Sequence, residues 1–134
     1  MVDIGGKPVQ QRRAVATGSL VCQPATIRAL RALALPKGDV LAAARVAAVQ
    51  AVKRASDLIP LCHPLPIEHI ETSFRLARNR VEITCRVATG AKTGVEMEAL
   101  AGVSIAALTL YDMCKAVDAT MRLEGIRLLE KTKE

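Results

Sequence analysis

Aromatic side chains are almost absent from this chain, which has no tryptophan and only Phe74 and Tyr111 as aromatic residues. Proteins that bind single-stranded nucleic acids commonly stack the bases on aromatic side chains, which this chain lacks. The basic residues give a net charge of +6 but are dispersed along the sequence, with no recognisable nucleic-acid-binding motif. We therefore expect no nucleic-acid partner, and the charge suits a small polyanionic ligand or ordinary solubility.

Long apolar runs are also missing, since none approaches the ~20 residues that a membrane-spanning helix needs. The N-terminal residues contain no apolar core of the kind found in signal peptides. The four cysteines, Cys22, Cys62, Cys85 and Cys114, are scattered and form no C-x-x-C pair. These absences predict a cytoplasmic protein with reduced cysteines, no membrane partner, no disulfide framework and no zinc site.

Small apolar residues dominate the composition: 51% of the chain is hydrophobic, mostly alanine, valine and leucine. This fraction argues against disorder, and 134 residues are enough for one hydrophobic core but too few for two. We therefore predict a single domain over residues 1–134. Small side chains bury little area per residue, so contacts with sister subunits would help to stabilise such a core.

Hydrophobic periodicity and turn residues divide the chain into strands and helices. The predicted strands are 14–22, 67–76, 81–89 and 125–130, and the predicted helices are 24–33, 40–55 and 95–120. Asp39 is expected to cap the second helix, and three prolines exclude helix from residues 56–66. The order β-α-α-β-β-α-β predicts an α+β fold, a ferredoxin-like split β-α-β sandwich with one additional helix. Its antiparallel sheet should be covered by helices on one face only.

The long helix pattern contains four conspicuous charges among apolar residues. Glu96 and Glu98 lie near its start, and Asp112 and Lys115 lie near its end. An ionised side chain in apolar surroundings destabilises the fold unless it is paired with an opposite charge or has a function. Acid–base catalysis commonly uses charged groups that are shielded from water in this way. The alternative is a helix with solvated ends and a short surface salt bridge between Asp112 and Lys115, which are spaced i,i+3.

The proline-rich segment Leu58–Pro66 places Cys62 and His63 in a short loop with little conformational freedom. Such a loop can hold an imidazole in position for catalysis, or it can be a connector whose histidine is merely hydrogen-bonded. The two neighbouring side chains should point apart, so we expect no shared metal ion.

Two further segments are candidates for phosphate binding. Lys37 precedes a helix N-terminus, where backbone N–H groups and the dipole favour anions, although such a lysine can also be simply solvated. Gly90–Gly94 (GAKTG) looks like the end of a phosphate-binding loop but lacks the G-x-x-x-x-G-K-[ST] spacing, and it serves equally well as a turn.

Helix geometry separates the charges of the long helix. Glu98 and Asp112 are about 21 Å apart along the axis, at about 1.5 Å per residue. One chain therefore cannot bring both to one small substrate. Either the helix carries two unrelated charged sites, or a second subunit supplies one half of a shared site.

Four segments match a known family in order and cover most of the chain: MVDIGGK (1–7), KGDVLAAARVAAVQAVKRASDLIPLCHPLP (37–66), KTGVEMEAL (92–100) and YDMCKAVD (111–118). As a set, LIPLCHPL, GVEMEAL and YDMCKAV are highly specific. The chain thus resembles the cyclic pyranopterin monophosphate synthase family of molybdenum cofactor biosynthesis. It departs from the family pattern at Gln10, where threonine is common, and at Lys131–Glu134, beyond which the family commonly has a Gly-, Ser- and Lys-containing tail.

The resemblance implies a ferredoxin-like fold and a homo-hexamer built as a trimer of dimers, with sites at the subunit interfaces and no cofactor. It implies a lyase that rearranges a cyclised GTP, 3′,8-cyclo-7,8-dihydroguanosine 5′-triphosphate, into cyclic pyranopterin monophosphate and releases pyrophosphate. The implied catalytic residues are Asp112, Lys115, Lys37 and His63, and the implied substrate-binding residues are Leu61, Cys62, His63, Glu96, Met97 and Glu98.

A different class of function remains open. A non-catalytic ferredoxin-like regulatory module that binds an anion or nucleotide would explain the fold and an anion site. A regulatory module would give no role to Asp112, Lys115 and His63. An enzyme that rearranges a ring would use these three residues for proton transfer.

Overall fold

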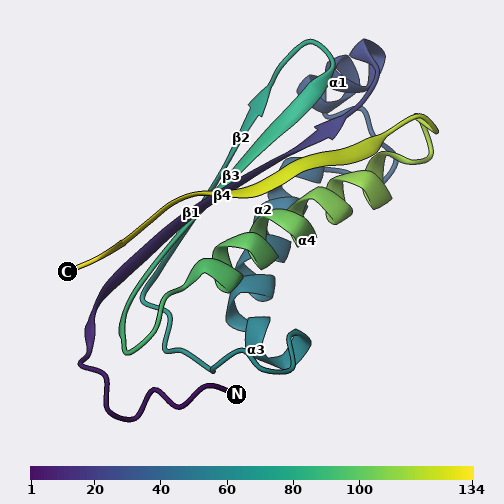
Figure 1. Cartoon of the computed structure of the whole chain (residues 1–134). Helices are drawn as coiled ribbons and strands as arrows, with labels where there is room; N and C mark the ends of the chain where they lie inside the picture. Colours follow the sequence, from purple (N-terminus) through teal and green to yellow (C-terminus); the bar gives the residue numbers. More distant parts are fainter.

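The computed structural model describes all residues, 1–134, in four strands and four helices (Figure 1). In chain order these are β1 (Gln10–Val21), α1 (Pro24–Arg31), α2 (Val40–Lys53), α3 (Ala55–Leu58), β2 (His69–Leu76), β3 (Arg80–Ala91), α4 (Glu96–Cys114) and β4 (Arg122–Lys133). Asp39 Oδ1 accepts a hydrogen bond from the Ala42 N–H at 3.1 Å, which confirms the predicted cap of α2.

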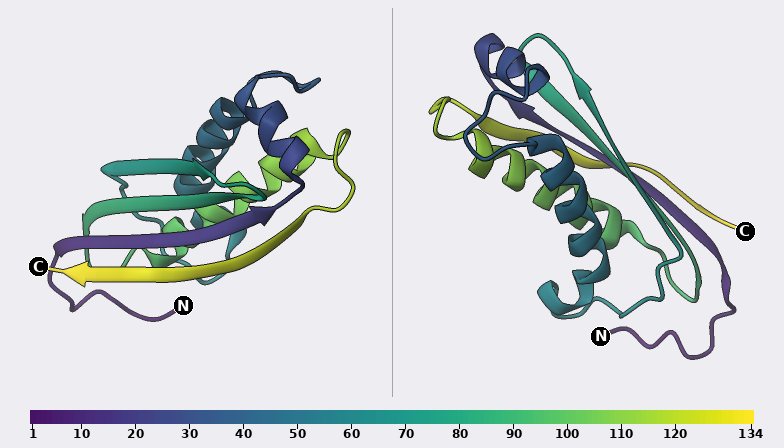
Figure 2. Two further views of the ribbon diagram at one scale, coloured as in Figure 1. Left: turned by 90° about the horizontal axis from the view of Figure 1, so that it is seen from above. Right: turned by 180° about the vertical axis from the view of Figure 1, so that it is seen from behind.

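The strands form one antiparallel sheet in the order β2-β3-β1-β4. One helical crossover joins β1 to β2 and another joins β3 to β4, and the two flank the β2–β3 hairpin. Figure 2 shows the strands side by side, with the helices on one side of the sheet. The predicted ferredoxin-like α+β arrangement, with helices on one face, is therefore confirmed.

Alternation along the central strands separates the two faces of the sheet. In β3, Val81, Ile83, Cys85 and Val87 are buried, and the residues between them are more exposed. The buried face packs against α2 and α4, whereas the opposite face carries polar and charged side chains. This period of two is what the sequence predicted for a half-buried sheet.

Small residues allow α4 to lie close to both α2 and the sheet. A Cβ atom on Gly102 would lie 2.7 Å from the Cys85 sulfur and 3.0 Å from Val52 Cγ2. A Cβ atom on Gly18 in β1 would lie 2.8 Å from Val103 Cγ1. At these two positions the layers are so close that a larger residue would push them apart.

By length and composition alone, α4 is apolar enough to cross a membrane, with a mean hydropathy of 1.3. In this fold it is a core helix instead. Its buried residues are Glu98, Ala99, Gly102, Val103, Ala106, Ala107, Leu110 and Cys114. The sheet and α2 cover one side of its apolar surface, and Leu108 on the other side is 51% exposed.

Several predicted boundaries are wrong. β1 and β4 extend through the polar residues 10–13 and 131–133, because backbone pairing does not require apolar side chains. α4 ends at Cys114 rather than near residue 120, because the chain tightens into a turn in which the Val117 amide donates to the Cys114 carbonyl three residues before it. α1 and α2 each end two residues before the predicted position, and residues 55–58 form the single turn α3.

A buried carboxylate ties the end of α4 to the start of α1. Asp118 is 3% exposed, and its Oδ2 accepts hydrogen bonds from the Gln23 N–H (2.9 Å) and the Thr26 hydroxyl (2.8 Å). Its Oδ1 accepts from the N–H (2.8 Å) and hydroxyl (2.6 Å) of Thr120. Burial by itself would raise the pKa of Asp118, but these hydrogen bonds outweigh it and lower the pKa to about 2.

Asp118 should make the stability of the fold depend on acid pH. Its pKa falls from 3.8 to about 2 on folding. At pH values above 3.8 the ionised carboxylate therefore contributes about 2 kcal/mol to the free energy of unfolding. This contribution is lost as the pH falls from 3.8 towards 2. Urea unfolding of Asp118→Asn should give a lower free energy of unfolding at neutral pH, and the difference from the native chain should shrink across that range. The exposed Asp57→Asn is the control. A constant difference at every pH would contradict the ionised role.

Candidate functional site

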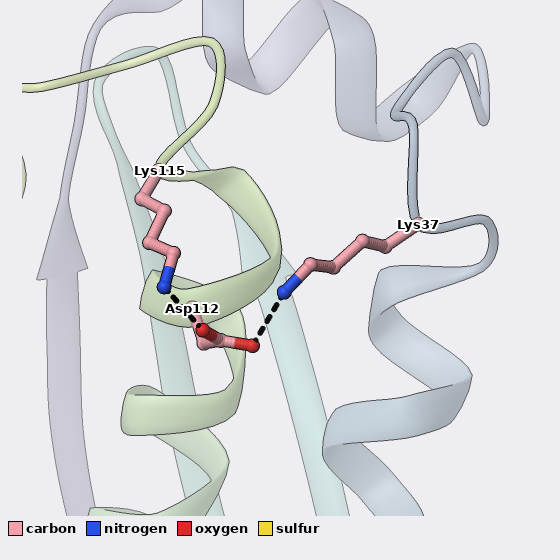
Figure 3. A network of polar contacts seen from close by, with 3 residues as sticks. All are labelled: Lys37, Asp112 and Lys115. Atoms are coloured by element: carbon pink, nitrogen blue, oxygen red, sulfur yellow. Dashed lines mark hydrogen bonds and ion pairs between the residues drawn. The ribbon is translucent and has the colours of Figure 1, made fainter.

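The first group of predicted site residues, the lysine–aspartate cluster, comprises Lys37, Asp112 and Lys115 (Figure 3). Asp112 lies in the last turn of α4, and Lys115 immediately follows that helix. Lys37 lies in the turn before α2, where the Gly38 N–H donates to the Leu35 carbonyl at 3.1 Å. Gly38 has a φ of +91°, which glycine adopts more easily than any other residue.

Asp112 lies between the two lysines, with Oδ2 2.8 Å from Lys37 Nζ and Oδ1 2.8 Å from Lys115 Nζ. The side chains are about half exposed: 53% for Asp112, 50% for Lys37 and 59% for Lys115. The expectation that Asp112 and Lys115 lie in apolar, water-poor surroundings is therefore wrong. Leu110 and Cys114 take the core-facing side of this turn, which leaves Asp112 on the solvent side.

Charge pairing, rather than burial, determines the protonation of this cluster. Hydrogen bonds from Lys115 and Lys37, reinforced by their charges, lower the pKa of Asp112 to about 2, and Asp112 raises the pKa of Lys115. Two ammonium groups and one carboxylate leave a net charge of +1 at neutral pH. A phosphate group would thus compete with Asp112 for the lysines.

The second group lines a hollow at the start of α4, which we call the Cys–His hollow. Its lining residues are Leu61, Cys62, His63, Leu65, Thr93, Gly94, Glu96, Met97 and Glu98. It therefore brings together all six residues predicted to bind substrate. One wall is the proline-rich loop, which is held by a hydrogen bond from the Cys62 N–H to the Ile59 carbonyl (3.1 Å) and another from the Thr89 hydroxyl to the Pro66 carbonyl.

Glu98 is the buried acid of the Cys–His hollow and is 3% exposed. The Cys62 thiol donates to its Oε1 at 3.7 Å, whereas Oε2 has no hydrogen-bond partner. Burial raises the pKa of Glu98; burial, and then the charge of Glu98, raise the pKa of the Cys62 thiol. A buried oxygen without a partner is costly, so this position calls for a donor from a ligand or from another chain.

A third hollow, which the sequence did not predict, adjoins the second; we call it the basic hollow. Its lining residues are Arg12, Arg13, Gly94, Glu96, Lys131, Thr132 and Lys133, so it shares Gly94 and Glu96 with the Cys–His hollow. Lys131 Nζ lies 3.1 Å from Glu96 Oε1. The basic residues are dispersed in the sequence but gather here, because β1 and β4 pair with Arg12 opposite Lys133. The Arg12–Arg13 pair was the only local signal of this hollow.

The lysine–aspartate cluster and the Cys–His hollow do not meet within one chain. Glu98 and Asp112 lie on the same helix, about 21 Å apart along its axis at about 1.5 Å per residue. His63, which was predicted to be catalytic together with Asp112, lies at the Glu98 end. The predicted site residues are therefore two separate halves in a single chain.

Comparison with known proteins agrees with this arrangement of motifs. A sequence profile described as the MoaC family matches residues 1–134. A cyclic pyranopterin monophosphate synthase from Chloroflexus aggregans is 55% identical over 98% of this chain and 81% of its own length. One from a Roseiflexus species is 54% identical over 98% of this chain and 85% of its own length.

A third relative is larger. A molybdenum cofactor biosynthesis bifunctional protein from Chlorobaculum tepidum is 54% identical over 98% of this chain, which corresponds to 42% of that protein. The profile match over the whole chain and the identity to these relatives lead to one conclusion. This chain belongs to the MoaC family.

Proposed function

We propose that this chain is a cyclic pyranopterin monophosphate synthase, a lyase of molybdenum cofactor biosynthesis. Family membership and identities of 55% and 54% to relatives with that name support the activity. The reaction converts 3′,8-cyclo-7,8-dihydroguanosine 5′-triphosphate into cyclic pyranopterin monophosphate and releases pyrophosphate. The net charge of +6 is consistent with a triphosphate substrate, and the scattered, unpaired cysteines are consistent with a cytoplasmic protein.

The structural observation that best supports this activity is the position of Asp112 between Lys37 and Lys115. Phosphate oxygens that bind the two lysines would take the hydrogen bonds that now lower the pKa of Asp112. Its pKa would then rise, and the carboxylate would become a better proton acceptor in the presence of substrate than in its absence. The lysines would meanwhile stabilise the charge of the departing pyrophosphate.

The Cys–His hollow suits the ring part of the substrate. A guanine-derived ring presents N–H donors, and Glu98 Oε2 is a buried acceptor without a partner. The aromatic content is too low for stacking, so hydrogen bonds from this hollow would have to hold the ring. We assign Leu61, Cys62, His63, Glu96, Met97 and Glu98 to substrate binding on this basis.

The active site is proposed to be shared between two chains. Two copies of α4 that meet antiparallel about a two-fold axis would bring the Cys–His hollow of one chain to the lysine–aspartate cluster of the other. Each dimer would then hold two complete sites, and three such dimers would form the hexamer. The alternative, a non-catalytic anion-binding regulatory module, would bind the substrate without forming a pterin, so a turnover assay distinguishes the two.

Charge removal from the lysine–aspartate cluster should stop the reaction without unfolding the chain. Asp112→Asn and Lys115→Met should each lower kcat by roughly 100-fold or more, because each removes a group proposed to transfer protons. The fold should survive, because both side chains are about half exposed and each change keeps the approximate volume. Lys53→Met, which changes an exposed lysine at the end of α2, is the matched control. Turnover of Asp112→Asn close to that of the native chain would refute its catalytic role.

Pyrophosphate should bind the native chain, inhibit it and raise its Tm, because a ligand of the folded state stabilises it by mass action. Lys37→Ala should lose much of that thermal shift, whereas Lys53→Ala should keep it. Thermal unfolding with and without pyrophosphate measures the difference. If Lys37→Ala kept the full shift and Lys133→Ala lost it, the pyrophosphate site would lie in the basic hollow instead.

Mixed dimers should recover activity if the site is shared. Glu98→Ala and Asp112→Ala should each be nearly inactive, and unfolding and refolding the two together should restore about a quarter of native activity. Random pairing makes half of the dimers mixed, and each mixed dimer carries one intact site and one doubly altered site. Recovery no greater than the sum of the separate variants would exclude a shared site.

A further inference from the structure

The N-terminal segment Met1–Val9 contains the family motif MVDIGGK, yet the proposed site gives it no role. In Figure 1 this segment extends beyond the lower end of β1, and the N-terminus lies just below the loop that follows α3. The Val2 carbonyl oxygen lies 2.8 Å from His63 Nε2, which places the segment at the edge of the Cys–His hollow. The Val2 side chain itself is 73% exposed, so the contact is made by the backbone.

The segment is attached at more than one point. Lys92 Nζ donates to the Gly5 carbonyl at 3.0 Å, and Asp3 Oδ1 accepts from the Gly5 N–H at 2.8 Å in a local turn. The Lys92 carbonyl in turn accepts from the Arg12 guanidinium at 3.2 Å. The N-terminal segment is therefore bound to both borders of the hollow, at His63 and at the β3–α4 turn.

A carbonyl oxygen can only accept a hydrogen bond, so the nitrogen facing Val2 must carry the proton. In the neutral imidazole of His63 that nitrogen is Nε2, and Nδ1 then bears the free lone pair. Val2 is the one protein partner of the ring, which leaves Nδ1 for a ligand. Without the Val2 carbonyl, the ring would exchange between its two tautomers and its plane would be free to turn.

We propose that the N-terminal segment is a positioning element of the active site: the Val2 carbonyl keeps the His63 proton on Nε2 and presents Nδ1 to the substrate. The catalytic role of this contact rests on the proposed function, whereas the tautomer of His63 rests only on the contact with Val2. During turnover Nδ1 accepts a proton from a substrate N–H or O–H group and later returns it. Nε2–H stays on the Val2 carbonyl throughout, so the enzyme ends each cycle unchanged.

The tautomer can be read directly by nitrogen NMR, because the chain has only two histidines, His63 and His69. The probe is the pair of ring nitrogen signals of each histidine, recorded in mildly alkaline buffer. In the full chain, Nε2 of His63 should report as protonated and Nδ1 as unprotonated. Removal of residues 2–4 should move both signals of His63 towards averaged positions, while those of His69 stay in place. Unmoved His63 signals would overturn the proposal.

Turnover tests whether the segment acts through His63. Removal of residues 2–4 should lower kcat roughly 10-fold in the native chain, since small displacements of a catalytic group carry such costs. In a His63→Gln background the same removal should have no further effect. Lys53→Met, an exposed change at the end of α2, is the control and should keep the native kcat. An equal loss in both backgrounds, or no loss in the native chain, would overturn the proposal.

The two experiments separate this inference from the proposed function. If the native chain forms no pterin, the proposed activity fails, and the ring nitrogen signals still decide whether the segment sets the tautomer. If pterin forms but truncation leaves the His63 signals unchanged, the positioning role fails and the proposed activity stands.

Discussion

The close approach of α4 to its neighbours is the constraint on which the rest of the structure depends. Gly102 lies against Cys85 and Val52, and Gly18 lies beneath Val103, at distances that leave no room for a Cβ atom. This packing offsets the small area that an alanine- and valine-rich core buries per residue, because dispersion contacts accumulate when backbones lie close together. It also fixes the two ends of α4 relative to the sheet, and both halves of the proposed site depend on those ends.

The same helix presents acids in two opposite environments. At its end, Asp112 is exposed and held ionised by two lysines. At its start, Glu98 is buried, and its pKa is raised because its charge is poorly solvated there. In the proposed site, a bound phosphate would raise the pKa of Asp112 by taking its lysine partners, and a hydrogen-bond donor would lower that of Glu98. Carboxyl groups whose environments shift their pKa values in opposite directions are often found at catalytic sites, where they take different acid–base roles.

Separation along α4 has a consequence for assembly. A small substrate cannot span ~21 Å of helix, so the proposed active site would be complete only if a second copy supplied its other half. The N-terminal segment makes a similar contact between distant parts of the chain, since its Val2 carbonyl is hydrogen-bonded to His63 of the proline-rich loop. In both cases the proposed site is formed where separate segments meet, so each segment can be held rigidly by its own contacts.

The sequence by itself determined the order and type of the main elements, the Asp39 cap of α2 and the α+β class, because hydrophobic period and turn residues are local properties. The single turn α3 was not predicted. The family resemblance also implied substrate-binding roles for six of the nine residues that line the Cys–His hollow. Only the tertiary structure decided three things: the exposure of Asp112, the gathering of Arg12 and Lys133 in the basic hollow, and the contact of Val2 with His63. Each of these depends on strand register or on which side of a helix faces the core, and those are set by contacts between residues far apart in the chain.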